Sequence, residues 1–100
     1  MDNALKLIGL MRKANKISLT EQKCKEDIKS GKSELILFAS DCSETVREKI
    51  RTLSEIHHVS YITCEYSKYD LASAAGSGLC SVISINDKGF SEAILKLINA

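Results

Sequence analysis

The sequence contains no proline and no tryptophan, and no long apolar run interrupts it. Because proline, low-complexity tracts and linker-like composition are all missing, we expect a single domain over residues 1–100. No apolar run approaches the roughly 18 residues that a membrane-spanning helix needs. The first residues, MDNALKLIGLMRKANK, mix charges with apolar side chains and lack the apolar core of a signal peptide. We therefore expect a cytoplasmic protein with no membrane partner.

The usual signatures of catalysis and metal binding are also missing. Glycines 76 and 78 precede a predicted strand, where neither a dinucleotide fingerprint nor a P-loop occurs, and no GxSxG elbow is present. His57 and His58 close a predicted helix, where histidine usually caps the C-terminus. The cysteines have no CxxC pair and no neighbouring histidine, and they stand among apolar or small residues. They are Cys24, Cys42, Cys64 and Cys80. We expect buried, reduced thiols, no zinc site, no cofactor and no enzymatic activity.

Charge is balanced over the whole chain but not along it. The net charge is +1, yet the first 33 residues hold eight lysines and arginines against four acidic residues. The remainder is correspondingly acidic. Such asymmetry is compatible with an anionic partner on one side of the fold, and it also lies within what chance gives.

Hydrophobic periodicity predicts alternating helices and strands. Helices are predicted over residues 3–15, 19–30, 45–56, 67–76 and 90–99, and extended segments over residues 16–19, 34–39, 59–64 and 80–85. Ser18 with Glu21, and Asp41 with Glu44, match the capping-box pattern. The alternation with short loops predicts an α/β fold, a three-layer α/β/α sandwich. The right-handed crossover rule places loops 40–43 and 65–68 along one edge of the sheet.

The most informative segment is residues 16–41, KISLTEQKCKEDIKSGKSELILFASD. Its helix has only Leu19, Cys24 and Ile28 as apolar residues, so it offers one narrow contact line to a core. Helix N-termini attract anions, and Gln and Lys side chains pair with adenine and guanine edges. The glycines beside Leu79 permit close backbone approach. Residue types alone leave a second interpretation open, in which the lysine-rich face is solvated and the glycine pair is a turn.

Four segments together carry a family resemblance. They are LIGLMRKANKIS, SGKSELILFASDCSE, YDLASAAG and SVISINDKGFSEAILKLI, and they cover nearly the whole chain. In this order and spacing they resemble the ribosomal protein L7Ae/L30e superfamily of kink-turn RNA binders, particularly its small bacterial YlxQ-type members. The resemblance implies an α/β/α sandwich with a small mixed four-stranded sheet, no catalysis, and RNA recognition through two loops.

In that family the second helix begins with Gly-Xaa-Asn-Glu-Xaa-Xaa-Lys, which reads the tandem G·A pairs of the kinked RNA. Counting back from Gly31, these positions fall on Thr20, Gln22, Lys23 and Glu26, and each departs from the pattern. At position 23 a lysine donor replaces the family's carboxylate acceptor, and at position 26 a negative charge replaces a lysine. The resemblance also implies backbone contacts to RNA from two lysines and from a second loop. These residues are Lys32, Lys68, Gly76, Ser77, Gly78, Leu79, Cys80 and Ser81.

We therefore expect a monomeric, non-enzymatic RNA-binding protein of the ribosomal or translation-associated kind. Its partner would be structured, kink-turn-like RNA, bound with altered specificity, and no DNA partner is expected. The alternative is a protein-interaction module on the same scaffold that has lost kink-turn binding. Glu26 and the altered helix start favour this alternative. Similarity of fold does not choose between the two, because sites carry function.

Overall fold

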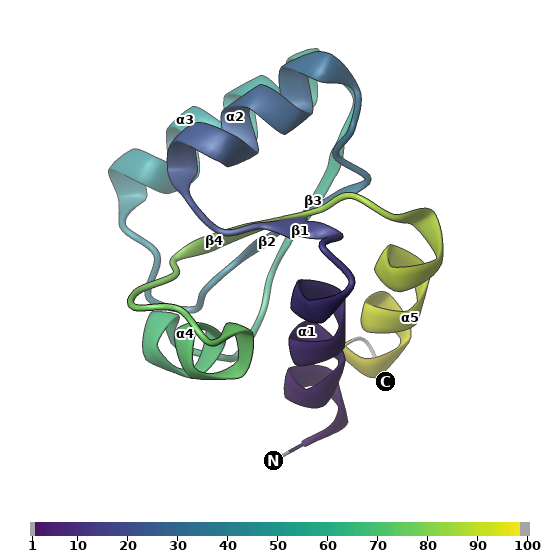
Figure 1. Ribbon diagram of the computed structural model, residues 1–100. Helices are drawn as coiled ribbons and strands as arrows, with labels where there is room; N and C mark the ends of the chain where they lie inside the picture. The colour runs from purple at the N-terminus through teal and green to yellow at the C-terminus, as the bar shows by residue number, and fades with distance from the viewer. Residues whose placement is uncertain (1, 99–100) are drawn as a thin grey trace.

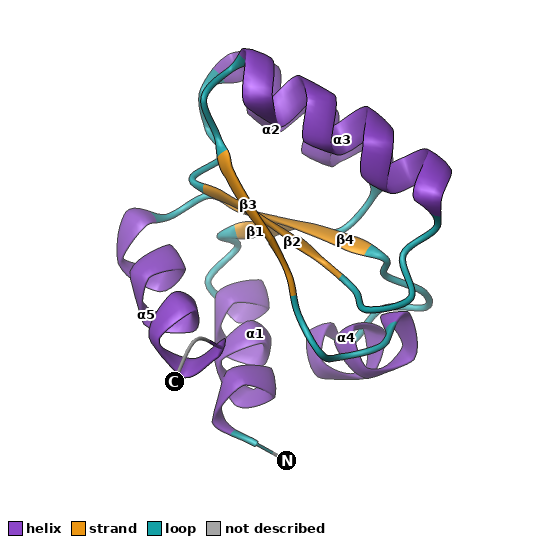
Figure 2. Ribbon diagram, turned by 180° about the vertical axis from the view of Figure 1, so that it is seen from behind, coloured by secondary structure: helices purple, strands orange, loops and turns teal. Residues whose placement is uncertain are grey.

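Helices cover both faces of one four-stranded sheet. The computed structural model describes residues 2–98 of the chain. Its elements, in chain order, are α1 (Asn3–Lys13), β1 (Ile17–Ser18), α2 (Glu21–Ser30), β2 (Leu35–Phe38), α3 (Glu44–Ile56), β3 (Ser60–Thr63), α4 (Lys68–Ala75), β4 (Val82–Ile85) and α5 (Lys88–Ile98). Figures 1 and 2 show α2 and α3 together on one face of the sheet and α1, α4 and α5 on the other. This is the three-layer sandwich that the sequence predicts.

The sheet is mixed, with strand order β1-β4-β2-β3. β2 pairs in parallel with β3 and antiparallel with β4, and β4 pairs antiparallel with β1. β1, β2 and β3 therefore run in the same direction, and their carboxyl ends lie at one edge of the sheet. This edge, formed by residues 19–23, 40–44, 64–68 and 76–81, is called the loop edge below. The prediction that loops 40–43 and 65–68 share an edge is confirmed.

The core is built around the two central strands. Every residue of β2 and of β4 is buried, whereas β3, an outermost strand of the sheet, has exposed or half-buried side chains. Ile8 from α1, Ile28 from α2 and Ile50 from α3 are each at most 1% exposed, and burying such a side chain contributes about 1.5–3 kcal/mol. All four cysteines are buried and unpaired by disulfides, as the sequence predicts. Within residues 2–98, no helix has both the length and the apolar character to cross a bilayer.

The start of α2 differs from the predicted capping pattern. Thr20, not Ser18, caps this helix, because its hydroxyl accepts the Lys23 backbone N–H at 3.1 Å. Ser18 belongs instead to β1, where it pairs with Ser84. Its hydroxyl donates to the buried carboxylate of Asp27 and is not available as a cap.

Two other predicted helix boundaries also shift. Ser43, rather than Asp41, caps α3 by accepting the Val46 backbone N–H at 3.3 Å. The last helix begins at Lys88, two residues earlier than predicted. Its predicted end at Asn99 lies outside the described residues.

A buried polar network fixes α2 to the sheet. Asp27, on α2, is 2% exposed, and its carboxylate accepts hydrogen bonds from the Ser18 hydroxyl and from Asn86 Nδ2, the latter at 2.9 Å. Ser84 Oγ donates to Asn86 Oδ1 at 2.7 Å. Buried polar groups are stable only when they are hydrogen-bonded, so these bonds specify one orientation of α2. That orientation presents the start of α2 at the loop edge.

Candidate nucleic-acid interface

Three helices begin at the loop edge. α2 follows Thr20, α3 follows Ser43 and α4 follows Ser67, and each of these hydroxyls accepts a backbone N–H from the first turn of its helix. A helix N-terminus carries roughly half a positive charge from its aligned peptide dipoles. The backbone of the loop edge therefore attracts anions from three directions.

The two predicted RNA-binding loops lie against each other. The Cys80 thiol donates to the Leu19 carbonyl at 3.8 Å, which joins the segment before β4 to the start of α2. The Ala39 backbone N–H donates to the Ser81 carbonyl at 2.9 Å, so the end of β2 adjoins the same segment. The structure thus brings residues 20–23 and residues 76–81 to one place.

Lys68 belongs to the same edge through a contact that the sequence did not predict. Its backbone N–H donates to Asp41 Oδ1 at 2.8 Å, and the Ser40 backbone N–H donates to the Tyr66 carbonyl at 2.8 Å. The Lys68 ammonium lies 5.8 Å from the centre of the Tyr69 ring. The loop after β2 and the start of α4 are therefore held together.

Three of the predicted reading residues form one exposed cluster on α2. Gln22 Nε2 donates to Glu26 Oε2 at 3.3 Å, and Lys23 Nζ lies 3.8 Å from Glu26 Oε1. Exposed ion pairs of this kind contribute about 0–1 kcal/mol. A ligand that contacts Gln22 or Lys23 therefore competes only weakly with Glu26. Thr20 is exposed beside them, although its hydroxyl is used as the helix cap.

The loop from Gly76 to Ser81 presents little except backbone and one apolar side chain. A Cβ at Gly76 or Gly78 would meet nothing within 4 Å, so both backbones are open to a ligand. Leu79 is 59% exposed, whereas Cys80 is 1% exposed. The Ser77 hydroxyl is buried and has no hydrogen-bond partner among the described residues. The exposed surface of this loop therefore consists mainly of backbone and the Leu79 side chain.

Lys32 does not join the other predicted residues. It follows Gly31 at the far end of α2, and the ten residues of this helix rise about 15 Å. The structure therefore places Lys32 near the opposite edge of the sheet from Thr20, Lys68 and the second loop.

Two side chains at the loop edge were missed by the sequence analysis. The Arg47 guanidinium lies 5.5 Å from the centre of the Phe38 ring and donates to the Thr63 hydroxyl and to the Cys42 carbonyl. Tyr69, in the first turn of α4, is 66% exposed. Both residues lie in the first turn of a helix that follows a strand, and this position is the sequence signal that could have identified them.

Acidic side chains outnumber basic ones at and beside the loop edge, where exposed Glu65 adds to the acids of the helix starts. The cations are Lys23, Arg47 and Lys68, and the other anions are Glu21, Glu26, Asp41, Glu44 and Asp70. The acidic residues in the first turns of the three helices offset the helix dipoles. The loop edge is therefore not a basic patch.

The buried thiols are unsuited to chemistry. Burial raises the pKa of Cys24 to about 12 and that of Cys80 to about 11, so both stay protonated at neutral pH. A protonated thiol is neither a good nucleophile nor a metal ligand. Over residues 2–98, no three His, Cys, Asp or Glu side chains are grouped so as to hold a metal ion.

Comparison with known proteins identifies relatives along nearly the whole chain. Residues 2–95 match the Ribosomal protein L7Ae/L30e/S12e/Gadd45 family. Two relatives, both named RNA-binding protein YlxQ, come from Bacillus subtilis strain 168 and Enterococcus faecium. The first is 25% identical over 93 residues, covering 93% of this chain and 92% of the relative. The second is 28% identical over 95 residues, covering 95% and 90%.

Solved structures share the fold. A protein of unknown function from Bacillus halodurans superimposes with a TM-score of 0.93 at 22% identity, with all of both chains covered. The Giardia lamblia 15.5kD RNA binding protein superimposes with a TM-score of 0.74 at 19% identity, covering 95% of this chain and 81% of that one.

Proposed function

The chain belongs to the Ribosomal protein L7Ae/L30e/S12e/Gadd45 family, and from this premise we propose that it binds structured RNA through the loop edge. The role is non-enzymatic, cytoplasmic and ribosomal or translation-associated, and the preferred RNA is kink-turn-like. The names of the two relatives, which describe RNA-binding proteins, support this proposal.

The observation that carries the proposal is the contact between the start of α2 and the second loop. Because the Cys80 thiol bonds to the Leu19 carbonyl, the loop that carries exposed Leu79 adjoins the segment leading into α2, where Gln22 and Lys23 are exposed. An extruded nucleotide packs on Leu79, while Gln22 and Lys23 meet base edges. Lys68 contacts a phosphate at the same edge.

Recognition of this kind rests more on shape than on base reading. Lys23 has no acceptor for guanine N–H groups, and Glu26 occupies a position where a cation would meet phosphate. The Thr20 hydroxyl already accepts the Lys23 backbone N–H as the helix cap. Backbone and phosphate contacts position a protein on RNA, and base contacts specify the sequence. The protein therefore holds a bent RNA with relaxed sequence preference.

A second candidate is a protein-interaction module. The excess of acidic side chains at the loop edge and the 3.8 Å contact between Lys23 and Glu26 favour it. Exposed Leu79 and Tyr69 suit a protein partner as well as a nucleotide. A nuclease-resistant association in cells would support this candidate, whereas a nuclease-sensitive one supports RNA.

Fluorescence anisotropy with two labelled RNAs tests the proposal. One RNA carries a bulge with tandem G·A pairs, and the other is a straight duplex of the same length. The native protein should bind the kinked RNA more tightly at low salt, where electrostatic contacts are strongest. If it binds neither RNA at low salt, the proposal is wrong.

A matched pair of leucine variants locates the surface. Leu79→Asp should weaken binding of the kinked RNA roughly ten- to a hundredfold. The variant loses the apolar contact that Leu79 makes with the bound RNA, and it adds a negative charge. Leu10→Asp, on α1, is the control, since Leu10 is 56% exposed and Leu79 is 59% exposed. Equal weakening by both variants would contradict the assignment of the loop edge.

A further inference from the structure

A groove separates the outer faces of α2 and α3. Its first hollow, of about 520 Å³, is lined by Lys25, Lys29, Glu48, Lys49, Thr52 and Leu53. A second hollow, of about 510 Å³, shares Lys29 and continues past Gly31 to His57 and His58. We call the two hollows together the α2–α3 groove. It leads from the middle of α2 toward the edge of the sheet opposite the loop edge.

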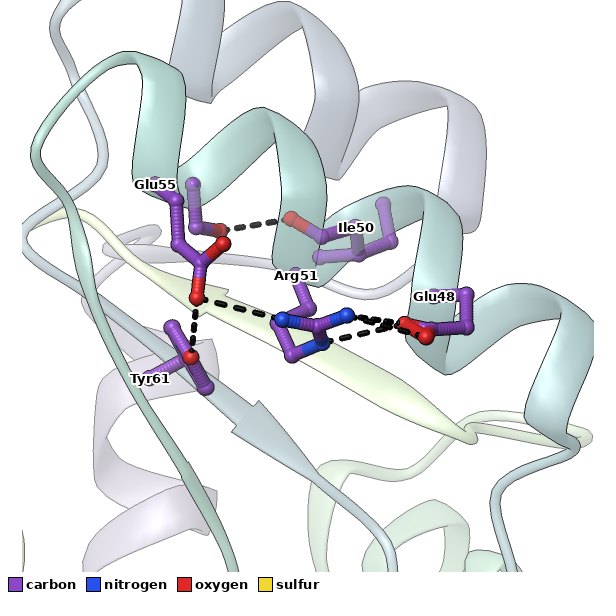
Figure 3. Close-up of polar contacts among 6 residues, drawn as sticks. Glu48, Ile50, Arg51, Glu55 and Tyr61 are labelled. Carbon is purple, nitrogen blue, oxygen red and sulfur yellow. Dashed lines mark hydrogen bonds and ion pairs between the residues drawn. The ribbon is translucent and has the colours of Figure 1, made fainter.

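The acidic side chains of α3 near the groove are already engaged, which leaves Glu34 as the acidic side chain of the second hollow. The Arg51 guanidinium bonds to Glu48 and lies 3.2 Å from Glu55 Oε2, and the Tyr61 hydroxyl donates to Glu55 at 2.7 Å. Figure 3 shows Arg51 between the two carboxylates on α3, with Tyr61 below Glu55. Glu48, the one acidic side chain in the first hollow, is therefore compensated by Arg51.

The lysines of the groove are compensated less. Lys25 pairs with Glu21 at 3.0 Å. Lys29 and Lys49 form no ion pair with any residue from 2 to 98. These two lysines outweigh Glu34 of the second hollow, so the groove is net positive, in contrast to the acidic loop edge, and it borders the same helix that begins at that edge.

We propose that the α2–α3 groove binds the phosphate backbone of one arm of the RNA whose bend meets the loop edge. This inference rests on the proposed function. Phosphate contacts supply most of the affinity of nucleic-acid binding, and the loop edge has few cations free to make them. Lys25 and Lys29 are one helical turn apart, a spacing close to that of successive phosphates on one strand. Thr52 and Leu53 also line the first hollow, where they would contact the riboses of the RNA strand.

The groove proposal also assigns a role to Lys32, which lies far from the loop edge. Lys32 directly follows Gly31, which lines the second hollow together with Lys29 and the two histidines. A duplex arm that leaves the loop edge and follows α2 would reach this end of the helix after about 15 Å. Lys32 would then meet a phosphate of the arm rather than one of the bend.

The test compares kinked RNAs with different arms. One RNA has arms just long enough to hold the bend, and two others have one arm or the other lengthened by a helical turn. For the native protein, one of the long-arm RNAs should bind at least tenfold more tightly than the short RNA. Its binding constant should also fall more steeply with salt, because more counterions are released.

Charge-reversed variants assign this gain to the groove. Lys29→Glu combined with Lys49→Glu should abolish the gain from the long arm and lower the salt slope for that RNA by about 2, with little change for the short RNA. Lys6→Glu combined with Lys96→Glu changes the net charge equally on the opposite face of the sheet, between α1 and α5, and should keep the gain. Lys29→Gln with Lys49→Gln should lower the slope by a similar amount without adding repulsion.

The outcomes separate this inference from the proposed function. If the native protein binds the short RNA but neither arm adds affinity, or the gain survives in the Lys29 and Lys49 variants, the groove proposal is overturned and RNA binding at the loop edge stands. An equal loss in the control pair also overturns it. If the native protein binds no RNA, both proposals fail.

Discussion

Replacing Lys23 by glutamate tests most directly whether the start of α2 contacts the bases of the RNA. Lys23 is the third residue of α2, and its backbone N–H donates to the Thr20 hydroxyl at 3.1 Å. A glutamate at this position completes a capping box and sits at the positive end of the helix, which is worth about 0.3–1 kcal/mol. Losing the exposed contact with Glu26 costs at most about 1 kcal/mol. The free energy of unfolding should therefore stay nearly unchanged.

The effect on RNA has two parts that must be separated. A carboxylate at position 23 accepts guanine N–H bonds in tandem G·A pairs, and a good bidentate contact discriminates by about 1–3 kcal/mol, or roughly five- to 150-fold. The lost positive charge weakens binding to every RNA alike. The informative quantity is therefore the ratio of two dissociation constants. One is for tandem G·A RNA and the other for the same RNA with Watson–Crick pairs in their place.

Anisotropy titrations of both RNAs at the same salt concentration give this ratio. Lys23→Glu should shift it toward tandem G·A RNA by at least fivefold and tighten binding to that RNA. Lys23→Gln, which removes the positive charge without adding a carboxylate, should leave the ratio close to the native value. If the ratio does not move in Lys23→Glu, or moves equally in Lys23→Gln, position 23 does not read the G·A pairs.

Three further predictions concern the scaffold. Asp27→Ala should lower the free energy of unfolding by about 3–5 kcal/mol, because it leaves buried donors unsatisfied; Glu26→Ala, its exposed neighbour, should stay within about 0.5 kcal/mol in urea unfolding followed by circular dichroism. The four thiols should react with a thiol reagent at pH 8 only as fast as the protein unfolds, and rapid reaction under native conditions would contradict their burial. The hydrogen bond to Asp2 raises the pKa of Tyr66 to about 12, so its contribution to stability is complete below pH 10 and is lost as the pH rises toward 12. Ultraviolet titration should show a phenol with a pKa of about 12, and Tyr66→Phe should remove it.

The fold was predictable because local signals agreed with the tertiary structure over most of the chain. Residues 34–39 contain an apolar run of strand length, and residues 80–85 are also predicted as a strand; both segments contain a central buried strand of the sheet. Gly31 and Gly76 end helices with φ of 82° and 70°, the left-handed conformation that glycine adopts most easily. The three layers follow from such signals, and the mixed four-stranded sheet follows from the family resemblance.

The helix starts were less predictable because several hydroxyl and carboxyl groups compete for each cap. Ser18 and Asp41 match the capping-box pattern, whereas the observed caps Thr20 and Ser43 lack the acidic residue or glutamine three positions on. Tertiary contacts decide between them, since Ser18 bonds to Asp27 and Asp41 accepts the Lys68 N–H. Neither partner is near in sequence.

The charge of the site could not be predicted because proximity across the fold sets it. In the sequence, the basic first third suggests one positive surface. In the structure, acidic first turns from three helices gather at the loop edge, while Lys29 and Lys49, from different thirds of the chain, line one groove. The shape recognition proposed for the loop edge and the phosphate binding proposed for the groove can thus be tested separately. Lys23→Glu should move the specificity ratio and leave the gain from a long arm intact, whereas the Lys29 and Lys49 variants should remove that gain and leave the ratio intact. Coupled changes in both quantities would mean that edge and groove act as one surface.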